Sequence, residues 1–150
     1  ALIHDKLYQG HSLSEVQLNE YLRELVEAIS STFMSNNNSV ELAFDLESVE
    51  VDVDKVVPCG LLVNELVVNA FKHAFNGENG TLTVRLNNHT DKAKLTVADD
   101  GPGLPDDFAL GAGDSLGSML IETFAAQLDA DIKIDNDHDG AKFVFTFPLT

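Results

Sequence analysis

The segment 64–75 does most to restrict what this chain can fold into, because it has helical periodicity and two unlike faces. Its polar side chains recur at i, i+4, i+7 and i+8 and would share one stripe of a helix. They are Glu65, Asn69, Lys72 and His73. The opposite flank is apolar and would face a sheet. A surface helix seldom aligns a carboxylate, an amide, an ammonium and an imidazole beside such a flank, so the segment indicates a site.

A second segment, residues 97–103, reads as an apolar strand that ends in an acid followed by two glycines. The acid is Asp99, and the glycines are Gly101 and Gly103. Glycines after a strand let the backbone approach a ligand closely. Together with the polar helix stripe, this strand end predicts a site for a nucleotide and a metal.

The charge of the chain limits its partners. Nine basic against twenty-five acidic residues give a net charge of −16, which argues against nucleic acid or an anionic membrane. The same charge would repel a free polyphosphate, so a phosphate site needs a metal and local backbone donors. The single cysteine, Cys59, excludes a disulfide framework and a zinc cluster and is expected in the core. No apolar run reaches the ~20 residues of a spanning helix, and no signal peptide is recognisable. Because the chain opens on Ala1 without a methionine, we expect a fragment of something longer.

The order of expected elements predicts an α+β fold, a two-layer α/β sandwich with three helices on a mixed sheet. One helix is expected from a serine cap at Ser12 or Ser14 to Phe33, and another, with Pro58 in its first turn, to Phe75. Strands are expected at 40–46, 81–87, 92–98, 131–134 and 142–147, with a short piece at Val51 and Val53. Residues 100–116 read as a long loop of the kind that forms lids, and 117–128 as a third helix.

These motifs resemble the ATP-binding catalytic domain of sensor histidine kinases, within the superfamily of gyrase, heat-shock chaperone, histidine kinase and mismatch-repair ATPases. Residues 64–75 are similar to its N box and 99–103 to its first glycine box. Residues 115–121 and 140–143 are similar to the second and closing boxes. The resemblance covers 38–150 and implies the Bergerat-type fold. Residues 1–37 resemble the end of a dimerisation helix region of the HisKA_2 type and its lead-in helix.

The resemblance implies a role for each polar residue of the site, and the chemistry of each side chain agrees. Asn69 offers an amide oxygen to Mg²⁺, and Glu65 holds a metal-bound water or accepts a proton as the catalytic base. Lys72 and His73 would lie near the ATP phosphates. Asp99 would accept a hydrogen bond from the adenine amino group. Asp100 stands where relatives often carry asparagine.

The lid is the other part of the implied ATP site. Gly101 and Gly103 would pass close to the nucleotide, and Ser115, Leu116 and Gly117 would contact phosphate at the start of a helix with free N–H groups. The implied cofactors are therefore ATP and Mg²⁺.

The function that follows is transfer of the γ-phosphoryl group of Mg-ATP to a histidine on a preceding helix, which we expect to lie outside this chain. The expected partners are that helix, in the same protein or its dimer mate, and a response regulator, but no nucleic acid or membrane. The expected location is the cytoplasm of a bacterium or archaeon, with membrane anchoring of the full protein left open. Two alternatives stay open: a non-catalytic, nucleotide-gated interaction module and an anti-sigma-type serine kinase.

Two further motifs resemble functional sites, a phosphoacceptor and a calcium loop, but each has a simpler structural interpretation. His4 with Asp5 is superficially similar to a phosphoacceptor motif, but only one helix fits between it and the next strand, so we interpret it as the tail of a dimerisation helix. Residues 135–140 match the opening of a calcium loop. The twelfth position is Thr146 rather than a glutamate, so an acidic hairpin turn is the better interpretation.

Overall fold

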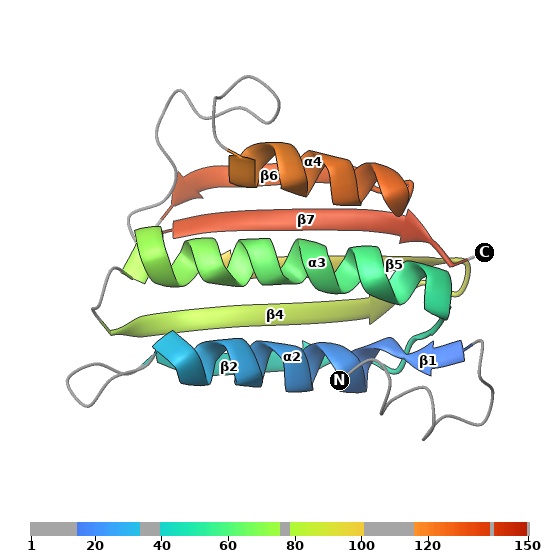
Figure 1. Ribbon diagram of the computed structural model, residues 1–150, viewed down its shortest axis with the longest axis horizontal. Helices are drawn as coiled ribbons and strands as arrows, with labels where there is room; N and C mark the ends of the chain where they lie inside the picture. The colour runs from blue at the N-terminus through green and yellow to red at the C-terminus, as the bar shows by residue number, and fades with distance from the viewer. Residues whose placement is uncertain (1–14, 34–39, 76–78, 101–115, 139, 150) are drawn as a thin grey trace.

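Three helices cover one face of a five-stranded sheet in the computed structural model, which describes residues 15–33, 40–75, 79–100, 116–138 and 140–149 (Figure 1). The helices are α2 (Leu18–Phe33), α3 (Val53–Asn69) and α4 (Leu116–Gln127). Helix α3 lies in the middle and contacts both α2 and α4. The predicted two-layer α+β sandwich is confirmed.

The sheet is mixed, in the order β2-β4-β5-β7-β6. Its strands are β2 (Val40–Leu46), β4 (Gly80–Asn88), β5 (Lys92–Asp99), β6 (Asp131–His138) and β7 (Gly140–Pro148). Strand β2 runs parallel to β4, and all other neighbours are antiparallel. The predicted antiparallel pairing of β4 with β5 is thus confirmed. Strands β6 and β7 are also antiparallel neighbours, but β6 continues to His138, into the segment 135–140 that was predicted as a hairpin turn.

The core lies between the sheet and the helices. Successive side chains of a strand point to opposite faces, so alternate residues of β5 and β7 are buried against the helix layer. Leu95, Phe145 and Phe147 have no exposed surface at all. Helix α2 contributes Leu18 and Leu22 to the same core, so it packs as part of the sandwich.

The first expected helix begins later than the sequence pattern predicted. Residues 15–17 form strand β1 (Glu15–Gln17), which pairs with β3 (Glu50–Asp52), so the prediction of a helix over them was wrong. The reason is tertiary: Val16 and Val51 lie opposite each other and are both buried. The Leu18 N–H then donates to the carbonyl of Val49 at 2.8 Å, where the helix begins. The proposed caps Ser12 and Ser14 lie outside the described residues.

The central helix also departs from expectation, because it begins at Val53 and Pro58 lies inside it rather than in its first turn. Residues Val56, Cys59 and Val63 are buried at helical spacing, and their burial favours helix over the whole stretch. The proline lacks an N–H, so only the carbonyl four residues earlier, at the exposed Asp54, loses its helical donor. Among the residues described, no helix is both long and apolar enough to cross a membrane.

Candidate functional site

The predicted site residues that the structure describes gather at one end of the sandwich. Helix α3 ends there, strand β5 ends there at Asp99, and both α4 and β7 begin there (Figure 1). Helix α4 packs against α3, and Asp99 is paired with Leu82 near the start of β4. The fold therefore brings together the polar helix stripe, the acid at the strand end and a helix N-terminus.

Glu65 and Asn69 supply the polar groups of α3 at this end. They are four residues apart in regular α-helix, so their Cβ atoms are about 5–6 Å apart on one face. Both side chains are half-buried, and Asn69 is the last residue of the α-helix. A carboxylate and an amide oxygen in neighbouring, partly desolvated positions can share a hydrated cation.

Beyond Asn69 the helix changes its winding. Residues Ala70–Phe75 form the π-helical turn η1, so the helix reaches Phe75 as predicted, but its last six residues do not keep the α-helical spacing that the polar stripe assumed. Phe71 stacks on Phe33 at 5.4 Å and meets Phe75 edge-on at 5.6 Å, and both Phe71 and Phe75 are buried. Lys72 lies in this wider turn, a form often found at functional sites, and its side chain is exposed. The side chain of His73 lies outside the described part of the chain.

Asp99, the last residue of β5, is held by the start of β7. Its Oδ1 accepts a hydrogen bond from the Ala141 N–H at 3.3 Å. Gly140 approaches so closely, with φ at +136°, that a Cβ there would overlap the carbonyl oxygen of Asp99. The sequence placed Gly140 in the closing box of the resemblance but predicted no contact between it and Asp99. The closing hairpin therefore sets the position of the predicted adenine acceptor.

Asp100 has a role that the sequence left open. Its Oδ1 accepts a hydrogen bond from the Thr81 N–H at 2.8 Å, which ties the segment after β5 to the start of β4. Gly80 stands beside this contact, where a Cβ would meet both the Phe75 ring and Asp100 Oδ1. An asparagine could accept the same bond through its amide oxygen.

We expect Asp100→Ala to lower the free energy of unfolding by about 1 kcal/mol, because the Thr81 N–H loses its acceptor. Asp100→Asn should cost less than half of that. Urea denaturation of both variants and the parent chain measures the difference. Equal losses in the two variants would show that the charge of Asp100, rather than this hydrogen bond, matters.

The structure describes only the last part of the predicted lid and phosphate-binding segment. Gly101, Gly103 and Ser115 lie outside the described residues, and Leu116 and Gly117 are the first two residues of α4. The first N–H groups of an α-helix have no partner within the helix, so the start of α4 offers the donors that the sequence predicted. Their contact with phosphate stays a prediction.

Other reactive groups do not compete with this site. Burial raises the pKa of the Cys59 thiol to about 12, so it is a core residue rather than a nucleophile. In the described ranges no three histidine, cysteine, aspartate or glutamate side chains cluster to hold a metal.

Comparison with known proteins agrees with this arrangement. Residues 54–150 match the family described as histidine kinase-, DNA gyrase B- and HSP90-like ATPase. The chain belongs to this family. Residues 1–33 match a second family, described as histidine kinase. The predicted ATP-binding catalytic module of the histidine kinase type is thereby confirmed, and neither open alternative is favoured.

The relatives of this ATPase domain are named histidine kinases. The chain is 26% identical to blue-light-activated histidine kinase 2 of Erythrobacter litoralis, covering 90% of the chain and 39% of that protein. It is 29% identical to the sensor histidine kinase PdtaS of Mycobacterium tuberculosis, covering 99% and 30% respectively. It therefore spans about three tenths to two fifths of the length of these relatives.

Solved structures show the same fold. The histidine kinase domain of the Erythrobacter litoralis EL346 blue-light-activated kinase superposes with a TM-score of 0.86 at 25% identity, covering 99% of this chain and 70% of that one. The catalytic domain of histidine kinase ThkA superposes with a TM-score of 0.75 at 24% identity, covering 91% and 95%. The second likeness supports the fold alone.

Proposed function

We propose that this ATPase domain binds Mg-ATP at the end of the sandwich where α3 and β5 terminate, and donates the γ-phosphoryl group to a histidine on a preceding helix. The observation that carries the proposal is the half-buried pair Glu65 and Asn69, at the same end as Asp99 and the start of α4. Phosphoryl transfer needs mainly positioning and charge neutralisation, and this set of groups can supply both.

Each described side chain has a distinct task in this proposal. The Asn69 amide oxygen binds Mg²⁺, which neutralises phosphate charge. Glu65, one turn earlier, holds a metal-bound water or takes the proton of the attacking imidazole. Asp99 accepts a hydrogen bond from the adenine amino group. The exposed Lys72 reaches the phosphates from the π-helical turn. His73, Gly101, Gly103, Ser115, Leu116 and Gly117 complete the proposed ATP site.

The partners follow from the chemistry of a phosphohistidine. We propose that the acceptor lies on a dimerisation helix, in the same protein or its dimer mate, and that a response regulator receives the phosphoryl group. In this proposal residues 1–37 join the dimerisation region to the catalytic domain of 38–150, and helix α2 of the first part packs on the sheet of the second. We propose a cytoplasmic location for the domain, because the transfer consumes ATP and the cytoplasm supplies it.

A labelling experiment tests the transfer. The full-length protein and the 150-residue chain are each incubated with Mg²⁺ and [γ-³²P]ATP. We expect label that is labile in acid and stable in base on the full-length protein only. Glu65→Gln should slow labelling about 100-fold, since general-base catalysis contributes typically 10²–10⁴-fold. The control, Glu27→Gln, removes an exposed carboxylate of α2 and should label at the parent rate.

Three results would contradict this proposal. Label on the isolated chain would mean that the acceptor, for example His4, is already present within it. No label on a full-length protein that binds ATP would favour the nucleotide-gated module. Acid-stable label would favour a serine kinase.

A further inference from the structure

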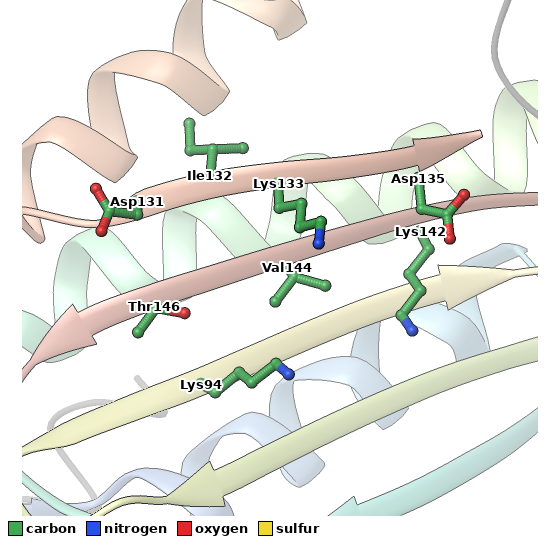
Figure 2. A pocket seen from close by; sticks show the side chains of 8 residues that line it. All are labelled: Lys94, Asp131, Ile132, Lys133, Asp135, Lys142, Val144 and Thr146. Atoms are coloured by element: carbon green, nitrogen blue, oxygen red, sulfur yellow. The ribbon is translucent and has the colours of Figure 1, made fainter. Parts of the chain in front are cut away.

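The face of the sheet opposite the helices carries a cluster of lysines that the ATP site does not use. Lys94 from β5, Lys133 from β6 and Lys142 from β7 surround Val144 on neighbouring strands (Figure 2). We name these three residues the lysine triangle. All three side chains are exposed, and they line a shallow hollow of about 380 Å³.

The register explains why the three lysines meet. Lys133 is paired directly with Val144, Lys94 with Thr146, and Lys142 with Asp135. Directly opposed residues have Cβ atoms about 5 Å apart and diagonal neighbours about 7–8 Å apart, so the ammonium groups can act on one ligand. Val144 and Thr146, both half-buried, form the floor between them.

The concentration of positive charge is notable against the composition of the chain. The triangle holds three of the nine basic residues of a chain with a net charge of −16. None of the three lysines is paired directly with another, and Lys142 is paired with Asp135, an opposite charge that favours this register. Among the described residues that line the hollow, Asp131 and Asp135 supply the carboxylates. Three ammonium groups therefore face two carboxylates, which leaves the hollow an excess of positive charge that favours an anionic ligand.

We propose that the lysine triangle docks a short, extended acidic segment of a partner protein. In an extended peptide, side chains that point the same way are about 6.8 Å apart, close to the diagonal spacing of Lys133 and Lys142 on neighbouring strands. Two successive acidic side chains can therefore meet this pair, and a further one can meet Lys94 on β5. The methylene groups of glutamate would lie on Val144, and the carboxylates would reach the ammonium groups. This docking is independent of ATP, because the triangle lies on the opposite face of the sheet from α3 and α4.

The charges around the lysine triangle limit the size of the anionic ligand that can bind there. A long polyanion or a charged membrane would meet the repulsion of the remaining acidic surface. A few carboxylates at the hollow would meet only the nearby Asp131 and Asp135, because charges more than about 8 Å away are screened at physiological salt. A single phosphate is too compact to reach cations spread over three strands, whose outer members are about 10 Å apart. The hollow therefore fits a peptide of a few residues.

Nuclear magnetic resonance of the ¹⁵N-labelled chain tests the docking. The probe is an eight-residue peptide in which glutamate alternates with threonine, and its control carries glutamine in place of glutamate. We expect saturable amide shifts on β5, β6 and β7 with the acidic peptide only. Lys133→Gln should raise the dissociation constant about fivefold, the effect of losing one exposed ion pair. The control Lys55→Gln removes the same charge from α3, in the other layer, and should leave it unchanged.

Other outcomes overturn the proposal. If Lys133→Gln and Lys55→Gln raise the dissociation constant of the peptide equally, the peptide responds to the overall charge of the chain and not to the lysine triangle. Displacement of the peptide by inorganic phosphate at equal concentration would identify a small-anion site. Absence of saturable shifts would leave the triangle without a peptide ligand. Lys133 is exposed on an outer strand, so the amide spectrum of its variant should keep the parent fold.

Discussion

Asp99→Asn is expected to weaken binding of a non-hydrolysable ATP analogue about 100-fold. The substitution replaces a carboxylate oxygen with an amide NH₂ group. This group is a hydrogen-bond donor, and it would face the adenine amino group, which is also a donor. Loss of a hydrogen bond to a charged group and the resulting unpaired donors cost about 3 kcal/mol, which corresponds to that factor. The fold should persist, because the asparagine oxygen can still accept the Ala141 N–H that now binds Asp99 Oδ1.

Calorimetric titration with and without Mg²⁺ measures the effect. The parent chain should bind the analogue more tightly with Mg²⁺, and Asp99→Asn should bind weakly under both conditions. Asp45→Asn is the matched control, because it makes the same chemical change at an exposed position of β2 and should bind like the parent. Unchanged binding by Asp99→Asn would mean that the nucleotide is held by other groups.

Much of this fold could be predicted because its signals are local. Alternation of apolar residues marks the strands, helical spacing marks α2 and α3, and both depend on near neighbours in sequence. The errors occurred where distant residues decide the structure. Residues 15–17 are a strand only because β3, more than thirty residues later, pairs with them. The π-helical turn coincides with the packing of Phe71 against Phe33, a contact that no local pattern reveals.

The same division applies to the site. Glu65 and Asn69 are four residues apart on one helix, so their proximity follows from the sequence alone. The support of Asp99 by Gly140 and Ala141 arises from the pairing of β5 with β7, across about forty residues. Sequence could name Gly140 as part of a family motif, but only the register of the sheet shows which atoms it contacts.

Gly140→Ala is therefore expected to be the most damaging small substitution in the described part of the chain. Its φ of +136° is a conformation that side chains rarely adopt, and a Cβ would overlap the carbonyl of Asp99. We expect a loss of at least about 3 kcal/mol in the free energy of unfolding, since strained backbone and steric overlap each cost about 1–3 kcal/mol. Urea denaturation measures this loss, and Lys92→Ala, exposed at the start of the neighbouring strand β5, is the control.

The same substitution separates stability from site geometry. If the hairpin moves to relieve the overlap, Asp99 moves with it, because Gly140 touches its carbonyl and the Ala141 N–H binds its carboxylate. The folded fraction of Gly140→Ala should then bind the ATP analogue at least tenfold more weakly than the parent, measured at a temperature where both are folded. Parent-like affinity in a destabilised variant would show that Asp99 keeps its place without the hairpin. A free energy of unfolding equal to that of the parent would show that the start of β7 can move without loss of stability. The proposed support of the adenine acceptor by β7 would then be wrong.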